Sequence, residues 1–288
     1  MSPESPESPH GAREARDTEV APGAQGARPT VGTVTRPSLL VDSALLARRH
    51  LLLMSRRPAS LMGALVLPLV FAFLFFVVFG KVVERRTGLG YEQYLLPAVV
   101  IQAILFAAMS AAILAVEDVT GGMVRRLRGM SVARSSPVLG LVGAELCRVL
   151  AATVALTLFG LLVGFRFHGA WGALGFLLFA LAFALVVCVG FATMGLAIAR
   201  AESVSVLANL IFFPLLLLSN AFVPSEAFPD WLEPVVTQQP ISRVADALRA
   251  LTDEGAAPAD TLLIALAWLA GGLLVCVPLA GRALGRNR

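Results

Sequence analysis

Six long runs of apolar residues dominate the sequence and determine what it can fold into. They cover approximately Ala59–Phe79, Leu95–Val116, Leu146–Phe165, Trp171–Ala197, Val204–Val223 and Leu262–Ala280. Each run holds the roughly 20 residues that a helix needs to cross a bilayer. Because 57% of the 288 residues are apolar and only 15% are charged, the chain has too little polar material to cover a water-soluble globule. We therefore predict an all-α polytopic membrane protein with six transmembrane helices.

The segment before the first run divides into two parts. Residues 1–38 are rich in Pro, Ser, Glu, Arg and Gly and hold no apolar stretch, which predicts a disordered tail and no secretory signal. In Leu39–Arg57, basic side chains such as Arg49 and Arg56 recur on one side and leucines occupy the other faces. This pattern predicts an amphipathic helix over residues 39–57 that lies in the membrane interface, with a solvated leader as the alternative. The six-span domain then occupies residues 58–285.

The distribution of arginine predicts the orientation in the membrane. If both termini lie in the cytoplasm, most of the arginines fall on the cytoplasmic side, as the positive-inside rule requires. Acidic residues gather on the opposite side, mainly between residues 224 and 260. The basic cluster of Lys81, Arg85 and Arg86 is an exception that this orientation does not explain. We therefore predict a multi-pass protein with a cytoplasmic N-terminal tail and a cytoplasmic C-terminus.

The connection between the second and third runs, residues 117–137, is too long for a simple turn. It begins with Glu117, Asp118 and a glycine pair and continues into an arginine-rich stretch. Met123, Leu127 and Met130 are spaced by four and three, so they share one face of a helix, whereas the arginines fall on the others. A short helix with an apolar ridge and basic flanks can dock into a groove on a soluble partner, and a solvated basic loop is the alternative.

A second long connection, residues 224–260, lies on the predicted outer side. It is rich in proline and acidic residues, and Trp231 stands where an interfacial aromatic residue would. Within it, Ser242–Leu251 predicts a short helix that dips back towards the membrane, because Val244, Leu248 and Leu251 share one face and Ser242 can cap its start. Loops of this length are usually functional.

Chemistry that depends on clustered reactive side chains is not indicated. Cys147, Cys188 and Cys276 fall in or beside apolar runs, which predicts buried thiols and neither a disulfide framework nor a zinc site. The sequence has no Gly-x-Ser-x-Gly motif and no Gly-x-x-x-x-Gly-Lys-Ser/Thr phosphate-binding loop. We predict no catalytic residues, no metal and no cofactor in this chain. The positive charge follows the membrane topology, so no nucleic-acid partner is predicted either.

Polar and aromatic side chains inside the runs are the candidates for a substrate path. Glu145 and Arg148 stand one helical turn apart and are predicted to pair at the cytoplasmic end of the third span. Other polar groups in spans tend to face protein or a cavity, and aromatic and Met side chains suit an adaptable apolar site. On the second and fifth runs these candidates are Gln102, Phe106, Met109, Ser110, Asn209, Phe212, Phe213 and Asn220. Helix packing is the alternative role for each of them.

A series of short motifs follows the six runs in a fixed order. They are Arg56-Arg57-Pro58, Phe79-Gly80, Tyr94-Leu95-Leu96-Pro97, Glu117-Asp118 with Gly121 and Arg125–Arg128, Ala221-Phe222-Val223-Pro224, Pro229-Asp230-Trp231-Leu232, Gln239-Pro240-Ile241-Ser242 and Asp246-Ala247-Leu248-Arg249. In this order the chain resembles the permease subunits of type-2 ATP-binding-cassette exporters, most closely the daunorubicin-resistance branch. The resemblance covers roughly residues 39 to 285. The stretch Gly129–Arg134 departs from the family's pattern, since it keeps the arginine but lacks the proline.

The resemblance implies a mechanism and a set of partners. Residues 39–57 would be the family's elbow helix, and residues 117–137 would be a coupling loop that rests on a separate cytoplasmic ATP-binding subunit, where ATP and Mg²⁺ bind. The residues implied in this coupling are Glu117, Asp118, Gly121, Arg125, Arg126, Leu127, Arg128 and Arg134. Six spans are half of such a transporter, so a second permease chain, identical or paralogous, is expected in the bacterial inner membrane.

The implied activity is outward transport of an amphipathic small molecule such as a drug or natural product. Export of a lipid, glycolipid or polysaccharide is the alternative within the family. A secondary transporter or channel is the alternative from another class, although the cores of the runs lack the ionisable residues that ion coupling usually needs.

Overall fold

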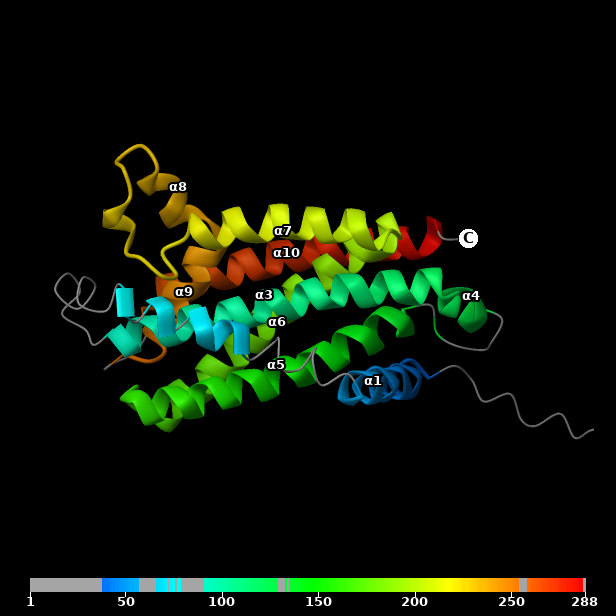
Figure 1. Cartoon of the computed structure of the whole chain (residues 1–288), viewed down its shortest axis with the longest axis horizontal. Coiled ribbons are helices and arrows are strands. Elements are labelled where there is room, and N and C mark those ends of the chain that lie inside the picture. Colours follow the sequence, from blue (N-terminus) through cyan, green and yellow to red (C-terminus); the bar gives the residue numbers. More distant parts are fainter. Residues whose placement is uncertain are drawn as a thin grey trace, which may run out of the picture. The chain divides into compact units, whose positions relative to one another are not determined.

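The computed structural model describes residues 38–56, 66–71, 73–75, 77–78, 91–128, 133, 135–253 and 258–286. Within these residues the chain is helical and has no strand, which confirms the predicted all-α fold (Figure 1). The helices are α1 (Leu39–Ser55), α3 (Tyr91–Thr120), α4 (Met123–Arg128), α5 (Ser136–Val163), α6 (Ala170–Ile198), α7 (Ala201–Leu217), the 3₁₀ turn η1 (Ser225–Ala227), α8 (Glu233–Gln238), α9 (Pro240–Ala250) and α10 (Ala259–Arg286). Residues 1–37 of the predicted tail (1–38) lie outside the described residues, and so do residues 59–65, 72, 76 and 79 of the first apolar run, whose Val66–Phe75 stretch is a shorter apolar helix.

Four of the described helices are long and apolar enough to cross a membrane. They are the segments Gln93–Thr120, Ser136–Val163, Ala170–Ile198 and Ala259–Gly285. These segments correspond to the second, third, fourth and sixth predicted runs. The third begins well before the predicted Leu146, because Pro137 stands in the first turn of α5 and Ser136 is already helical.

The fifth predicted run forms a shorter helix than its apolar length suggested. Helix α7 ends at Leu217, whereas the prediction extended the span to Val223. The chain leaves the helix after Leu218, and the Ser219 hydroxyl donates a hydrogen bond to the Leu216 carbonyl at 2.6 Å. Of the six predicted spans, four meet the length and hydropathy requirement for a transmembrane helix within the described part of the chain. The count of six stays a prediction.

Helix α3 is the most buried of the long helices and packs most extensively on α6. Its inward face is rich in alanine, with Ala108, Ala111 and Ala112 fully buried. At Gly195 of α6, an added Cβ would stand 2.2 Å from the Ala112 carbonyl oxygen, so the two backbones touch only because this residue is glycine. Small residues at such a crossing allow the close helix contact on which membrane helix association depends.

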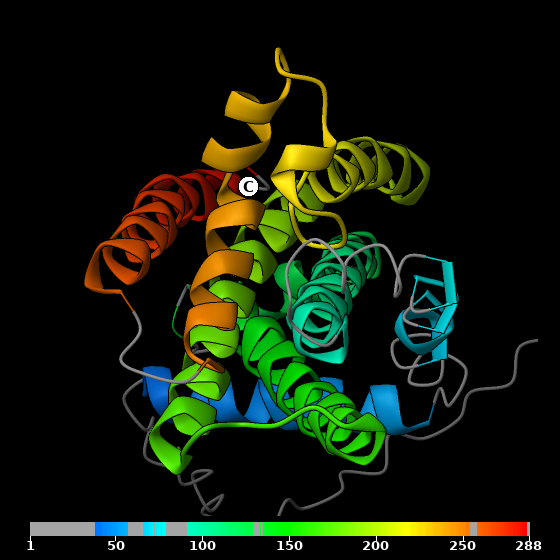
Figure 2. The same cartoon turned by 90° about the vertical axis from the view of Figure 1, so that its left-hand side faces the viewer.

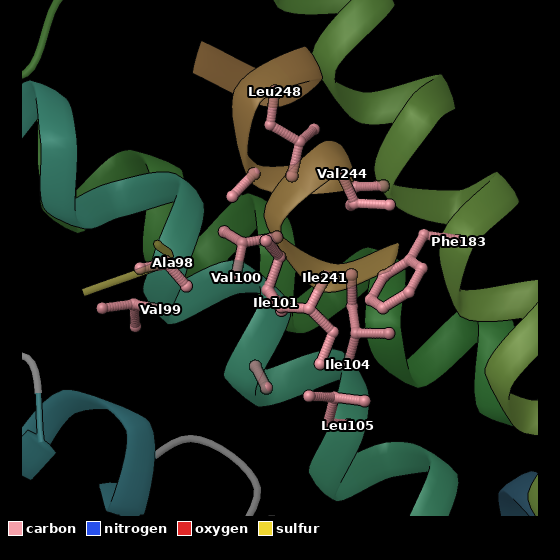
Figure 3. Packing of buried hydrophobic residues seen from close by; sticks show 14 of the residues in the cluster. Ala98, Val99, Val100, Ile101, Ile104, Leu105, Phe183, Ile241, Val244 and Leu248 are labelled. Atoms are coloured by element: carbon pink, nitrogen blue, oxygen red, sulfur yellow. The ribbon is translucent and has the colours of Figure 1, made fainter. Parts of the chain in front are cut away.

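The short helix α9 is buried among the long helices. Ile241, Val244 and Leu248 project from it towards Ile101 and Ile104 of α3, as Figure 3 shows. Val244 and Leu248 are fully buried on one face as predicted, whereas the third predicted member, Leu251, follows the end of the helix and is partly buried. The predicted cap is wrong, because Gln239 occupies the N-cap position and Pro240 the first helical position, while the Ser242 hydroxyl accepts the backbone N–H of Asn220 at 3.1 Å.

Helix α1 lies across the bundle of long helices, on the side of α5 (Figure 2). Its polar and apolar faces are arranged differently from the prediction. His50, from the expected basic side, is buried against the protein, whereas Leu40, Val41 and Leu45 are exposed. The exposed apolar surface is consistent with contact to lipid. The placement of α1 in the membrane interface stays a prediction.

Candidate functional site

The turn between α3 and α4 is built by a glycine pair. At Gly121 an added Cβ would stand 2.9 Å from the Glu117 carbonyl oxygen, and Gly122 adopts a φ of +70°, which side chains disfavour. The pair therefore lets the chain leave α3 and start α4 within two residues. Helix α4 lies at the end of the bundle opposite α8 and α9 (Figure 1), as predicted for the two long connections.

Asp118, in the last turn of α3, fastens this end of the helix to α1. Its carboxylate lies 3.1 Å from Arg49 Nη1 and 3.2 Å from His50 Nε2. A second link joins α1 to the chain that follows α4, where the backbone N–H of Ala133 donates to Asp42 Oδ2 at 3.2 Å. Helix α1 thus contacts both ends of the predicted coupling loop.

The predicted coupling residues divide by where their side chains lie. Glu117, Gly121 and Arg126 are exposed, whereas Leu127 is buried against its own chain and Asp118 is directed to α1. The side chains of Arg125 and Arg128, and Arg134 as a whole, lie outside the described residues. The role of this group in coupling stays a prediction.

Three of the predicted path residues form an aromatic group between α3 and α7. The ring centroids of Phe106 and Phe212 are 5.0 Å apart, and those of Phe212 and Phe213 are 4.9 Å apart. Phe212 is 1% exposed and Phe213 is 46% exposed, so the group runs from the interior to the surface of the chain. Met109, on the same helix as Phe106, is partly buried and packs against the same core.

The remaining path candidates lie elsewhere. Buried Gln102 belongs to the interior of α3, and its Oε1 has no hydrogen-bond partner. Ser110 is partly buried on α3, near the Glu145 carboxyl group of α5. Asn209 donates to the Ser205 carbonyl of its own helix at 2.8 Å. Asn220 belongs to a polar cluster at the α9 end of the bundle, and the role of all these residues in a substrate path stays a prediction.

The predicted Glu145–Arg148 pair is present, with 2.7 Å between Glu145 Oε2 and Arg148 Nη2. Both side chains are almost fully buried. Because α5 starts at Ser136, the pair stands about two and a half to three and a third turns inside the helix and not at its end.

A polar cluster at the α9 end contains residues to which the sequence reasoning gave no role. Arg249 Nη2 donates to the carbonyl oxygens of Asn220 at 3.0 Å and Ala221 at 2.6 Å. Asn220 Nδ2 donates to Asp246 Oδ1 at 2.7 Å. Burial raises the pKa of Asp246 above its usual value, although Arg249 and this amide oppose the rise. Asp246 and Arg249 belong to one of the sequence motifs, and that motif was the available signal.

The described residues contain no group of three or more His, Cys, Asp and Glu side chains placed to hold a metal ion. The three cysteines are free thiols. Cys188 is buried as predicted, whereas Cys276 is half-buried and Cys147 is exposed on α5.

Comparison with known proteins gives one family and several relatives. Residues 43–252 match the family model described as ABC-2 type transporter. The chain is 30% identical over 265 residues to the daunorubicin resistance ABC transporter permease protein DrrB1 of Streptomyces coeruleorubidus, covering 91% of this chain and 90% of the relative. It is 28% identical over 260 residues to the probable doxorubicin resistance ABC transporter permease protein DrrC of Mycobacterium tuberculosis, covering 86% and 91% of the two chains.

Proposed function

This chain belongs to the ABC-2 type transporter family, and we propose that it is the membrane-spanning subunit of an ATP-driven exporter. A separate cytoplasmic subunit binds ATP and Mg²⁺ and supplies the energy. A second permease chain, identical or paralogous, completes the path across the bacterial inner membrane, with both termini in the cytoplasm. The chain itself holds no catalytic group in this proposal.

The arrangement of α4 carries the proposal. This short basic helix stands at the end of α3 and presents the exposed Arg126, while Leu127 anchors it to its own chain. Asp118 ties the same end of α3 to α1 through Arg49 and His50. A movement imposed on α4 by a partner therefore reaches α3 and α1 together, which is what energy coupling requires.

We propose an amphipathic small molecule as the substrate class. The group of Phe106, Phe212 and Phe213 offers aromatic surface that reaches the outside of the chain, where a second copy or lipid would lie. Aromatic faces bind flat apolar groups without a fixed hydrogen-bond pattern. The relatives named above are described as daunorubicin and doxorubicin resistance permeases, which supports a drug or natural product as cargo.

Co-purification of the partner tests the proposal. The full chain, tagged and solubilised from cells that express its native neighbours, is expected to bring down a protein with a phosphate-binding loop. The charge-reversed variant Arg126→Glu/Arg128→Glu is expected to insert normally, lose this protein and lose ATP-dependent efflux. Arg200→Glu is the matched control, because Arg200 is an exposed arginine that precedes α7.

The outcomes separate the alternatives. Partner capture and efflux at wild-type levels in the double variant would refute the coupling surface. A preparation without any ATPase would refute the exporter proposal and favour a secondary transporter or channel. Capture of the ATPase together with flipping of a labelled lipid, and no drug efflux, would favour lipid export within the same family.

A further inference from the structure

Three stretches that are far apart in sequence meet at the α9 end of the bundle. They are the first turn of α3, which carries Tyr94, the turn after α7 at residues 218–222, and helix α9. We call this group the outer unit. It includes parts of the four sequence motifs that begin at Tyr94, Ala221, Gln239 and Asp246. None of these motifs contributes a residue to the predicted coupling residues or to the aromatic group of Phe106, Phe212 and Phe213.

Arg249 of α9 joins all three stretches. Its guanidinium group donates to the carbonyls of Asn220 and Ala221, and its Cζ atom lies 3.6 Å from the centroid of the Tyr94 ring. The Tyr94 hydroxyl donates to the same Asn220 carbonyl. A planar, forked cation can stack on an aromatic ring and donate to two acceptors at once, which lysine cannot do.

Other residues of α9 hold the same turn from a second side. The Ser242 hydroxyl accepts the Asn220 N–H, Asp246 accepts the Asn220 side-chain amide, and the Gln239 side chain donates to the Leu218 carbonyl. The last carbonyls of a helix have no partner within it and must find one elsewhere. Here α9 and its N-cap residue Gln239 supply partners to the chain leaving α7, which stabilises the turn that follows the helix.

Apolar packing completes the outer unit. Helix α9 inserts its buried face against α3, and Phe222, one residue beyond the clamped turn, stacks on Phe75 with ring centroids 4.4 Å apart. Separating α3 from α7 here would break the stacking of Arg249 on the Tyr94 ring and the hydrogen bond from the Tyr94 hydroxyl to the Asn220 carbonyl. Losing these contacts at a buried site costs free energy, so the unit resists opening.

We propose that Arg249 is a positioning residue that clamps the outer ends of α3, α7 and α9 into one rigid unit. In the transport cycle, which rests on the proposed function, the outer ends of α3 and α7 then move together. The exit path opens beside the outer unit, towards a second chain or lipid, and not between α3 and α7 of one chain.

Distances between spin labels on the full-length chain test the clamp. In a variant whose three native cysteines are replaced, labels at Leu217 and Ala250 report on α7 and α9, and unlabelled chain in excess suppresses distances between copies. The resting wild type is expected to give one narrow distance peak. Arg249→Ala is expected to lose that peak, and Arg249→Lys to broaden it. Arg243→Ala, which removes an arginine of the same helix that donates to Gln238, is expected to keep it.

Two results would overturn the inference. The first is a peak as narrow in Arg249→Ala as in the wild type. The second is a shift of the Leu217–Ala250 peak when the complex with its ATPase is trapped with vanadate. Failure of the proposed function would look different. No ATPase would then bind, and the distance between labels at Leu217 on two copies would not respond to nucleotide. The comparison of the resting variants would still show whether Arg249 holds α7 and α9 together.

Discussion

Replacement of Gly140 by alanine is predicted to push α1 away from α5. An added Cβ at Gly140 would stand 2.5 Å from Leu46 Cβ and 3.1 Å from both the Ala47 nitrogen and the Ser43 carbonyl oxygen. All three atoms belong to the backbone of α1 or are fixed to it, so no side-chain rotation relieves the clash. Because carbon atoms in contact prefer about 3.5–4.0 Å, α1 must move away by at least about 1 Å.

That displacement is enough to break the links that α1 makes to α3. The distances from Asp118 to Arg49 and His50 are 3.1 and 3.2 Å, and both would lengthen beyond hydrogen-bonding range. Overpacking of this kind typically costs about 1–3 kcal/mol of folding stability. We expect a lower unfolding temperature and, in the assembled transporter, substrate-stimulated ATP hydrolysis reduced more strongly than basal hydrolysis.

Gly143 provides the matched control. It lies on the same helix and faces the same partner, but its added Cβ would stand 3.6 Å from Ala47 Cβ, an ordinary contact. Gly143→Ala is therefore expected to keep the wild-type unfolding temperature in detergent. The transporter assembled with this variant is expected to show wild-type ATP hydrolysis in liposomes. Equal behaviour of the two variants would refute the reasoning that α1 must sit this close to α5.

Three further predictions concern buried groups. Phe212→Ala removes a ring that is 1% exposed and is expected to cost about 3–5 kcal/mol, whereas Phe213→Ala, at a half-exposed site, is expected to leave thermal unfolding nearly unchanged and to alter the apparent KM for efflux. Glu145→Ala strands the Arg148 charge and is expected to cost about 3–5 kcal/mol, while Glu145→Leu/Arg148→Met is expected to recover most of this loss in the same unfolding assay. Burial raises the pKa of Asp246, so between the unfolded and folded pKa values the folded chain binds a proton at Asp246 more strongly than the unfolded chain does. The free energy of unfolding is therefore expected to fall as the pH rises above about 4. Asp246→Asn is expected to reduce this dependence in a pH series of unfolding temperatures.

The sequence predicted the elements that depend on local composition. Hydropathy identified α3, α5, α6 and α10, and the spacing of Val244 and Leu248 identified α9, because a helix with one apolar face has the same pattern wherever it lies. The Glu145–Arg148 pair followed from a spacing of three on one helix. These are relations between residues that are close in the chain.

The missed features depend on residues that are distant in the chain. Val204–Val223 is a predominantly apolar run whose polar residues are only two serines and two asparagines, so its mean hydropathy could not show that the helix ends at Leu217. That end is stabilised by α9, which supplies Arg249, Ser242 and Gln239 to the departing chain. The inward orientation of His50 has the same origin, because its partner Asp118 is separated from it by most of two spans. The pattern of α1 alone places His50 on the outward basic side, whereas its contact with Asp118 of α3 turns this side chain inward.

The two polar sites share helix α3, and this has a mechanical consequence. Asp118 fastens one end of the helix to α1, and Tyr94 fastens the other to the outer unit, about 36 Å away at 1.5 Å per residue. Between them α3 packs closely on α6, where Gly195 meets the Ala112 carbonyl, so a push at Asp118 travels along it as a rigid displacement. Pro97 interrupts the hydrogen bonding of α3 one turn from Tyr94, next to the clamp. Bending α3 therefore costs least free energy near Pro97, at the boundary between the rest of α3 and the outer unit. A small tilt of α3 at this point leaves the contacts of Arg249 intact.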